Sequence, residues 1–196
     1  MSTFKCDTIT NAAGTGKPDF PNSLTVAGAP LTSATPGTGL QITNEATLDA
    51  AISAGKKELV IAGSFPITSK KVLADNMTVR GTTNSIQISA ASGSFGAGDA
   101  MFEIPAGVKN VNLLNLNLFT SLTNISCISI KNTAVRNNVR GCLLEIPAAS
   151  TYFCVYNDGQ KNRVSNNSLV SNGRSSVALK EDGNASGNAN FGNVAE

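Results

Sequence analysis

The feature that most constrains the fold of this chain is a series of short apolar runs, which begins at residue 58 and continues almost to the C-terminus. Most runs are three to five residues long and are bounded by Gly, Asn, Asp or Ser. In the longest run, at 108–119, apolar residues interleave with asparagines. An alternation of period two is typical of half-buried β-strands. The series therefore predicts an all-β chain built from many short strands.

The composition favours strands and turns over helices. Charged residues make up 14% of the 196 residues, against roughly 25% in an ordinary soluble domain. Polar positions are instead filled mostly by Asn, Ser, Thr and Gly, which prefer turns and extended backbone to helix interiors. Helical bundles and coiled coils are therefore not expected. The 41% of hydrophobic residues are enough for one core.

The short length of the strands indicates how they are arranged. They are too short for a sandwich of ordinary depth, but they suit a solenoid in which each coil contributes two or three strands. The runs recur at intervals of about 12 to 23 residues. Asn is frequent between residues 110 and 138, where it can adopt left-handed turns and stack into ladders. We predict a short parallel β-helix of roughly six coils, with a β-sandwich or jelly roll as the alternative.

One helix is predicted, over residues 44–54. Asn44 or Thr47 can cap its N-terminus, and Glu45 lies at the positive end of the helix dipole. Gly55 follows as a natural terminator. We expect this helix to cover the open N-terminal end of the solenoid, where it hides the apolar cross-section of the first coil.

Residues 1–43 differ from the rest because Gly and Pro recur too often for long regular elements. Their hydrophobic residues are isolated, so the segment cannot form a core and is predicted to be an extended arm. Residues 44–196 are assigned to the solenoid domain. The polar segment 180–196 is predicted to be a tail, which crosses to a neighbouring chain or frays.

Several kinds of chemistry are excluded by what the sequence lacks. There is no His, which excludes Ser-His-Asp and Cys-His catalysis and His-ligated metal sites. The 15 basic residues are scattered and the net charge is only +2, so no nucleic-acid partner is expected. No apolar run approaches the roughly 20 residues of a membrane span, and residues 1–10 do not resemble a signal peptide. We therefore expect no membrane partner, and synthesis in the cytoplasm.

The four cysteines form no Cys-x-x-Cys pair. Cys127, Cys142 and Cys154 are predicted to be small core residues rather than metal ligands or disulfide partners. No EF-hand or repeat calcium spacing is present, so no metal or other cofactor is predicted.

Cleavage of a polysaccharide would require two carboxylates about 5–10 Å apart. The candidates are Glu145, Asp158, Glu181 and Asp182. Asp158 lies in an Asn-Asp-Gly sequence, and Glu181 and Asp182 precede a glycine, which are both turn signatures. We therefore predict that these carboxylates have turn or solvent roles, and that the protein has no catalytic residue and is not an enzyme.

The segment 58–81 resembles the opening coils of pectate-lyase-like right-handed β-helices. In that family a helix precedes a strand, followed by a G-x-[FY]-x-[IL] turn and an N-x-T-[LV]-x-G coil. Here the helix corresponds to residues 44–54, the turn to residues 63–67 (GSFPI) and the coil to residues 76–81 (NMTVRG). The resemblance covers roughly residues 44–175. It implies a short right-handed parallel β-helix, and it implies no particular activity.

A second resemblance lies in the arm, where residues 5–26 read KCDTITNAAGTGKPDFPNSLTV. This stretch is similar to a short element near the start of bacteriophage virion proteins, especially tail fibres and spikes. The chain departs from that element at Cys6, Lys17 and Ser23. The residues that it keeps are Asp7, Thr8, Ile9, Asn11, Gly14, Thr15, Gly16, Pro18, Phe20, Pro21 and Leu24. The resemblance implies a phage structural protein that docks through its arm.

Together, the two resemblances imply a non-enzymatic bacteriophage virion protein whose arm anchors the solenoid to the particle. The residues predicted to anchor it are Phe4, Asp7, Ile9, Phe20, Pro21, Leu24 and Val26. Phage spikes are typically trimers, and a trimer would cover the apolar surface and open sheet edges of a thin solenoid. A homotrimer is therefore expected.

Three functions follow as alternatives. The first, favoured by the short chain and the missing catalytic groups, is a trimeric capsid decoration or cement protein that contacts the major capsid protein. The second is a tail fibre or short tailspike, which contacts tail proteins and recognises a host surface glycan. The third is a small polysaccharide-degrading enzyme. In the first two cases the protein is made in the host bacterial cytoplasm and is located on the capsid surface or the tail of the virion.

Overall fold

The computed structural model of this chain describes residues 25–26, 29–30, 39–83, 85–171 and 178–195. The chain divides into two units, residues 1–38 and residues 39–196, and each is described by itself. In the first unit, β1 (Thr25–Val26) pairs antiparallel with β2 (Ala29–Pro30). The second unit contains all the other described elements.

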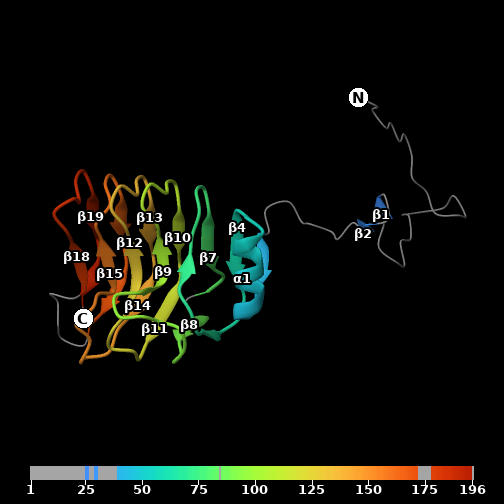
Figure 1. Ribbon diagram of the computed structural model, residues 1–196, viewed down its shortest axis with the longest axis horizontal. Coiled ribbons are helices and arrows are strands. Elements are labelled where there is room, and N and C mark those ends of the chain that lie inside the picture. The colour runs from blue at the N-terminus through green and yellow to red at the C-terminus, as the bar shows by residue number, and fades with distance from the viewer. Residues whose placement is uncertain (1–24, 27–28, 31–38, 84, 172–177, 196) are drawn as a thin grey trace, which may run out of the picture. The chain divides into compact units, whose positions relative to one another are not determined.

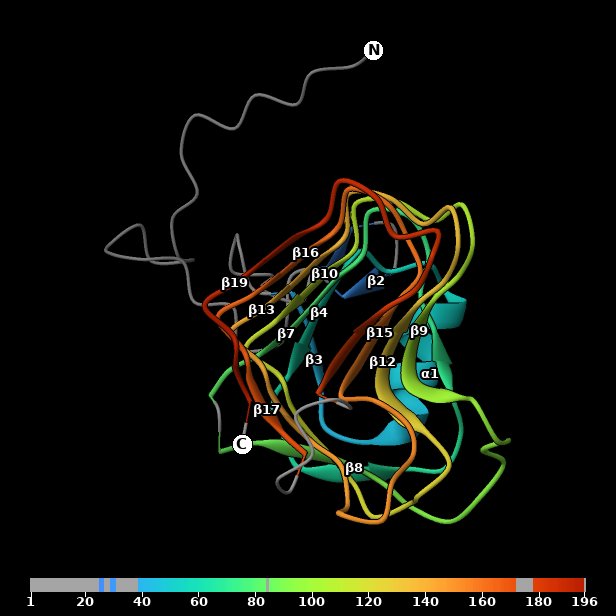
Figure 2. The ribbon, with the colours of Figure 1, turned by 90° about the vertical axis from the view of Figure 1, so that its left-hand side faces the viewer.

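The second unit is a parallel β-solenoid, which confirms the predicted all-β fold (Figure 1). From β4 onward, successive strands along the chain enter three different sheets in turn, so that each coil adds one strand to each sheet. Figure 2 looks along the stack, where strands of successive coils overlie one another. The sandwich alternative is wrong, because the strand pairs within this unit are parallel.

The first sheet has seven strands. They are β3 (Leu40–Ile42), β4 (Glu58–Ile61), β7 (Thr78–Gly81), β10 (Asn112–Leu114), β13 (Asn138–Arg140), β16 (Arg163–Ser165) and β19 (Ala189–Phe191). They lie side by side in this order, so the sheet grows by one strand with each coil.

The second and third sheets have six and five strands in the same sequential order. The second contains β5 (Phe65–Ile67), β8 (Gln87–Ala90), β11 (Asn117–Thr120), β14 (Leu143–Glu145), β17 (Ser168–Val170) and β20 (Val194–Ala195). The third contains β6 (Lys71–Val72), β9 (Ala100–Ile104), β12 (Ser126–Ile130), β15 (Val155–Asn157) and β18 (Leu179–Glu181). The five strands of the third sheet correspond to about five complete coils, against the six expected.

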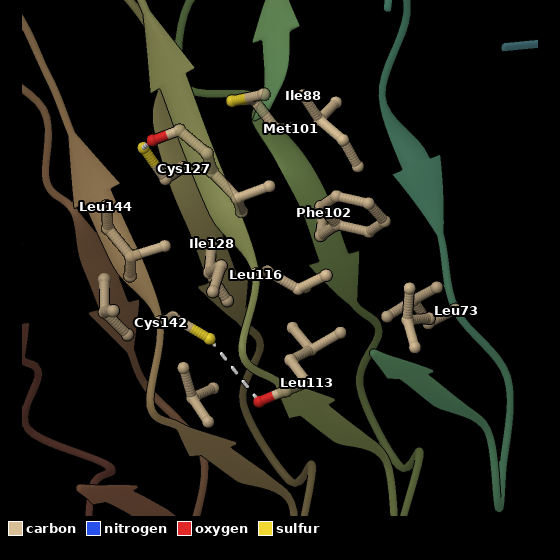
Figure 3. Packing of buried hydrophobic residues seen from close by; sticks show 14 of the residues in the cluster. Leu73, Ile88, Met101, Phe102, Leu113, Leu116, Cys127, Ile128, Cys142 and Leu144 are labelled. Atoms are coloured by element: carbon tan, nitrogen blue, oxygen red, sulfur yellow. Dashed lines mark hydrogen bonds between the residues drawn. The ribbon is translucent and has the colours of Figure 1, made fainter. Parts of the chain in front are cut away.

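The interior of the solenoid is filled by columns of apolar side chains (Figure 3). In the first sheet, one column runs in register through all five complete coils and every member is fully buried. Its members are Leu59, Val79, Leu113, Val139 and Val164. Because full burial of one such side chain contributes roughly 1.5–3 kcal/mol, these columns hold the coils together.

Cys127, Cys142 and Cys154 are free thiols buried in this core, as predicted. The sulfur of Cys142 lies 3.6 Å from the carbonyl oxygen of Leu113 in the preceding coil (Figure 3). Burial raises the pKa of Cys142 to about 11 and that of Cys154 to about 12, and it raises the pKa of Cys127 well above its usual value. The three thiols are therefore neutral and act as small core side chains.

Helix α1 (Glu45–Ser53) covers the N-terminal end of the solenoid, as predicted (Figure 1). The side chain of Asn44 caps it and accepts a hydrogen bond of 2.9 Å from the backbone N–H of Thr47. Gly55 follows the helix with a φ of 65°, a left-handed conformation that glycine adopts at low cost. Leu48 is fully buried beneath the helix.

The buried side chain of Lys71 fastens the helix to the first coil. Its Nζ lies 2.6 Å from Oε1 of Glu45 and 2.7 Å from Oδ1 of Asp49, and only 1% of the lysine side chain is exposed. Burial by itself raises the pKa of Glu45, but hydrogen bonds from Lys71 and Thr68 outweigh that effect and hold the pKa below its usual value. Glu45 is therefore a carboxylate that neutralises the buried ammonium.

Left-handed residues mark the corners on both sides of the first sheet. Those that precede a strand are Asn76, Asn110, Arg136, Lys161 and Gly187. Those that follow a strand are Asn115, Gly141, Asn166 and Gly192. Asn and Gly tolerate this conformation better than other residues, which explains why the sequence is rich in both.

Two amide ladders run through the last coils. In the first ladder, Asn137, Asn162 and Asn188 stack, and each Oδ1 accepts a hydrogen bond from a backbone N–H of the preceding coil. These bonds measure 2.9, 2.9 and 2.7 Å. In the second ladder, Asn167 accepts from the N–H of Cys142, and Asn193 accepts from the N–H of Asn167. The expectation that asparagines stack along the solenoid is confirmed.

The coils have unequal lengths. The later steps of the first sheet are almost equal, and their in-register positions are Leu113, Val139, Val164 and Asn190. Before them, the step from Leu59 to Val79 is shorter and the step from Val79 to Leu113 is longer. The spacing expected from the sequence is wrong for most coils, because it compared runs that belong to different sheets.

Two predicted boundaries are also corrected. Strand β3 lies within the segment assigned to the arm, yet it pairs with β4, so the solenoid unit begins at Gly39. The segment 180–196, predicted to be a tail, instead supplies the end of β18 and the strands β19 and β20, which pair in register with the preceding coil. Its polar composition reflects its place at the end of the core.

Candidate functional site

A row of polar and aromatic residues lines the outer face of the third sheet. Glu103, Ser129, Tyr156 and Lys180 are in-register neighbours on β9, β12, β15 and β18. Each alternates along its strand with a residue that points into the core, such as Phe102 beside Glu103. Parallel pairing therefore brings together four side chains from four coils that are far apart in the sequence.

A pocket opens beside this row, and we call it the aromatic pocket. Its lining residues are Gly98, Ser126, Ser129, Lys131, Tyr152, Phe153 and Tyr156. Its volume is about 130 Å³, which is small compared with the roughly 300–1,000 Å³ of pockets that enclose whole small molecules. The pocket therefore suits one ring of a larger ligand.

The aromatic rings of the pocket are held in place by their neighbours. Phe153 and Tyr156 stack with ring centroids 5.8 Å apart and an angle of 27° between the ring planes. The Tyr156 hydroxyl donates to Oδ2 of Asp182 at 2.7 Å. That hydrogen bond, together with burial, raises the pKa of Tyr156 to about 12, and it lowers the pKa of Asp182. Tyr156 is therefore a neutral phenol with a fixed ring.

Ser129 offers an unused hydroxyl to the pocket. Its side chain is 2% exposed, and its Oγ has no hydrogen-bond partner among the described residues. A buried hydroxyl without a partner costs free energy, and proteins keep few such groups.

Charged side chains form a rim next to the aromatic pocket. Lys70 lies 2.9 Å from Asp99 and 3.3 Å from Glu103, and Lys131 lies 3.6 Å from Glu103. Burial by itself raises the pKa of Asp99, but hydrogen bonds from Lys70 and from the backbone N–H of Gly96 outweigh it and hold the pKa below its usual value. The rim therefore holds Asp99 as a charged carboxylate beside the ammonium group of Lys70.

Of the four predicted carboxylates, Glu145 lies apart from the other three. Asp158, Glu181 and Asp182 come together at the ends of the adjacent strands β15 and β18, where Asn157 pairs with Glu181 and the N–H of Asp182 donates to the carbonyl oxygen of Asn157. Glu145 lies on β14 in the second sheet, whereas Asp158 follows β15 in the third. Glu181 accepts hydrogen bonds from Asn157 and Asn188, and Asp182 accepts from Tyr156 and from the N–H of Gly183. Asp158 and Asp182 directly follow the strands β15 and β18, as the turn interpretation predicts, whereas Glu181 is the last residue of strand β18 and does not lie in a turn.

The predicted anchoring residues are not tested by the structure. Phe4, Asp7, Ile9, Phe20, Pro21 and Leu24 lie outside the described residues, and Val26 is described only as part of strand β1. The described residues contain no cluster of ligands that could hold a metal ion. None of the helices in the described ranges is long and apolar enough to cross a membrane.

The aromatic pocket was not predicted from the sequence. Its lining comes from three successive coils, at Gly98 before β9, at β12 and the residue that follows it, and at β15 with the segment that precedes it. The available signal was the clustering of Tyr152, Phe153 and Tyr156, which include both tyrosines of the chain. Without the coil length, nothing in the sequence places Ser129 and Lys131 beside them.

The chain matches no family model, and no curated protein matches it. Among solved structures it is similar to the Dettilon tailspike protein, with 17% identity and a TM-score of 0.48. That alignment covers 76% of this chain and 35% of the tailspike chain, so this chain spans about a third of its length. It is also similar to a candidate glycosyl hydrolase from Parabacteroides merdae, with 10% identity, a TM-score of 0.45 and coverage of 79% and 92%.

Proposed function

We propose that this chain is a non-enzymatic protein of a bacteriophage particle, and that its aromatic pocket binds one saccharide unit of a host surface glycan. The observation that carries the proposal is the aromatic pocket itself, with two tyrosines, a buried hydroxyl without a partner and a charged rim. The resemblance of residues 5–26 to phage virion proteins supports the placement on a virion.

The chemistry of the pocket matches that of a sugar ring. A pyranose combines an apolar C–H face with a rim of hydroxyl groups, and an aromatic ring presents a flat apolar face to such a ligand. Ser129 can both donate to and accept from a sugar hydroxyl. Lys131, with a side chain that is 38% exposed, adds a charged donor at the edge of the pocket.

Binding without turnover is proposed because the nearby carboxylates lack the properties of a general acid. Glycoside cleavage requires one carboxylic acid that stays protonated near neutral pH. Asp99 has a lowered pKa, and both Asp99 and Glu103 are ion-paired with Lys70. The lowered pKa keeps Asp99 charged, and the ion pairs with Lys70 hold both carboxylate side chains in place.

The proposal is tested by measuring the binding of the full chain to an array of bacterial surface polysaccharides. We expect the wild type to bind at least one glycan, and Tyr152→Ala and Tyr156→Ala to bind it at least tenfold more weakly. Phe191→Ala is the matched control, because Phe191 is an aromatic residue that is 46% exposed on the first sheet, outside the pocket.

Two results would contradict this proposal. Failure of the wild type to bind any glycan, or equal binding by the pocket variants, would remove the saccharide assignment. The release of shorter oligosaccharides from the bound glycan, detected by mass spectrometry, would remove the non-enzymatic assignment and restore the third alternative.

Within a virion, the pocket favours a tail fibre or short tailspike over a capsid decoration protein, because recognition of a host glycan belongs to the tail. The decoration alternative stays open because an arm can equally anchor a trimer over capsomer junctions. Quantitative mass spectrometry of virions separates the two. About a dozen copies per particle would support the tail position, and hundreds would support the capsid position.

A further inference from the structure

The arginines of the described residues all lie on one side of the solenoid. Arg80, Arg140 and Arg163 point outward from β7, β13 and β16, because each alternates along its strand with a buried valine. Arg136 precedes β13 at a left-handed corner of the same sheet. Every other described residue with a basic side chain is a lysine. Parallel pairing therefore gathers on the first sheet arginines that are far apart in the sequence.

We call this surface the basic face. It consists of the outward positions of β7, β10, β13 and β16, together with the left-handed residue that precedes each of these strands. None of these positions is acidic, and five of them are basic, namely Arg80, Arg136, Arg140, Lys161 and Arg163. Among the described strands of the first sheet, the only outward acid is Glu58 on β4. The face therefore carries an excess of positive charge, although the net charge of the chain is only +2.

The five cations of the basic face form no ion pair with any described residue. The ion pairs in the described part of the chain involve Lys70, Lys71 and Lys131, which lie elsewhere. Arg136 and Lys161 each lie two residues before the in-register positions of β13 and β16, so they are neighbours on adjacent coils. Adjacent coils are about 4.8 Å apart, and like charges at such a separation repel each other. An anion bound between these side chains would relieve that repulsion.

The backbone at this corner gives a second reason to assign a function to the two side chains. Arg136 and Lys161 have φ values of 59° and 54°, in the left-handed region. The coils on either side place Asn110 and Gly187 at the same corner, and both residue types adopt this conformation at lower cost. Backbone strain of this kind is found mostly at functional sites. The fold alone would be served better by Asn or Gly at both positions.

Uncharged polar side chains lie between the cations. Thr78, Asn112 and Asn138 are in-register neighbours on the outer side of β7, β10 and β13. The Oδ1 of Asn138 has no hydrogen-bond partner among the described residues. Arginine binds carboxylate and phosphate groups through paired hydrogen bonds, whereas Asn and Thr suit hydroxyl groups. The basic face therefore matches a ligand that carries both anionic groups and hydroxyl groups.

We propose that the basic face binds an acidic polysaccharide, whose carboxylate or phosphate groups contact the arginines and whose hydroxyl groups contact the asparagines. A single-stranded nucleic acid fits less well, because no position of the face carries an aromatic residue on which a base could stack. A protein partner also fits less well, because Leu114 is the only large apolar residue of the face and interface cores are apolar. The basic face lies on a different sheet from the aromatic pocket, so this proposal is independent of the saccharide proposal.

The test measures the binding of the full chain to immobilised polysaccharides by biolayer interferometry. Polygalacturonate carries carboxylates, phosphomannan carries phosphates, and unphosphorylated mannan is the neutral control. We expect saturable binding to one or both acidic polysaccharides, and binding to mannan that is at least tenfold weaker. The acidic polysaccharide that binds more tightly identifies the preferred anionic group.

Substitutions at the left-handed corner remove charge and relax the backbone at the same time. Lys161→Asn should weaken binding at least threefold, and Arg136→Asn combined with Lys161→Asn should weaken it at least tenfold. The Tm of the double variant should be no lower than that of the wild type, because Asn is favoured in this conformation. The matched control is Lys180→Asn, which removes the same charge from an exposed residue of the third sheet and should bind like the wild type.

Far-UV circular dichroism checks that each variant is folded. If the double variant does not fold, Arg140→Gln on the exposed side of β13 supplies the same test, with binding at least threefold weaker than that of the wild type. The proposal is overturned if the wild type binds mannan as well as the acidic polysaccharides, if the folded corner variants bind like the wild type, or if Lys180→Asn weakens binding as much as Lys161→Asn. It is also overturned if duplex DNA binds more tightly than both acidic polysaccharides, since the occupant is then a nucleic acid.

Discussion

The substitution Asn162→Ala tests whether the amide ladder holds the coils together. Asn162 is 1% exposed, and its Oδ1 accepts from the backbone N–H of Asn137 at 2.9 Å and from the side-chain amide of Asn137 at 3.1 Å. Its own amide donates to the carbonyl oxygen of Ala134 at 3.1 Å and to Oδ1 of Asn157 at 3.2 Å. Truncation to alanine removes all four hydrogen bonds at once.

The size of the loss depends on which partners retain another hydrogen bond. The Ala134 oxygen still accepts from Gln160, and the Asn137 amide still donates to Val108. Only the backbone N–H of Asn137 is left buried without an acceptor, which costs about 1–3 kcal/mol. With the weaker bonds and the space left by the side chain, we expect a total of about 3 kcal/mol. For a chain of this size, that lowers Tm by roughly 6–12 °C.

The matched control is Asn188→Ala, which removes the next member of the same ladder. Asn188 is only partly buried in the last coil, so water can replace its hydrogen bonds. We expect a loss of about 1 kcal/mol or less. Both variants are measured by urea unfolding followed by far-UV circular dichroism, because the chain has no Trp for fluorescence. Equal losses in the two variants, or a loss below about 1 kcal/mol for Asn162→Ala, would refute the role of the ladder.

Two further predictions concern ionisable groups. The pKa of Glu45 is below its ordinary value of 4.5, so its pairing with Lys71 stabilises the fold above that pH, and this contribution is lost as the pH falls through the lowered pKa. The substitution Lys71→Met should therefore weaken the dependence of stability on pH in acid unfolding curves. An unchanged curve would contradict the contact between Glu45 and Lys71. The pKa of Tyr156 is raised to about 12 from 10, so its contribution to stability is complete below pH 10 and is lost as the pH rises through about 12. In an ultraviolet titration, the phenolate step near pH 12 should vanish in Tyr156→Phe and should shift to a lower pH in Asp182→Asn. A step near pH 12 that persists in Tyr156→Phe would show that the raised pKa does not belong to Tyr156.

The local elements of the fold could be predicted from the sequence because their signals lie within a few residues. Asn44 and Gly55 bracket α1 as expected, and the short apolar runs correspond to strands of the solenoid. The burial of Cys142 could also be anticipated, because it lies in an apolar run without the spacing of a metal site.

The arrangement across coils could not be predicted, because it depends on the length of each coil. Nearly equal steps begin only at Leu113, after a shorter step from Leu59 to Val79 and a longer step from Val79 to Leu113. That irregularity hides the repeat in the sequence. The contact between Ser129 and Tyr156, and with it the aromatic pocket, exists only when the register between β12 and β15 is known.

The direction of the amide ladders has a consequence for synthesis on the ribosome. Each coil receives its side-chain acceptor from the coil that follows it, as the N–H of Asn137 does from Asn162. Translation at about 5–20 residues per second delivers a coil of this length in about 1–5 s. During that time the newest coil has a backbone N–H donor without its side-chain acceptor. One such donor is therefore unpaired at each stage while the solenoid is being synthesised.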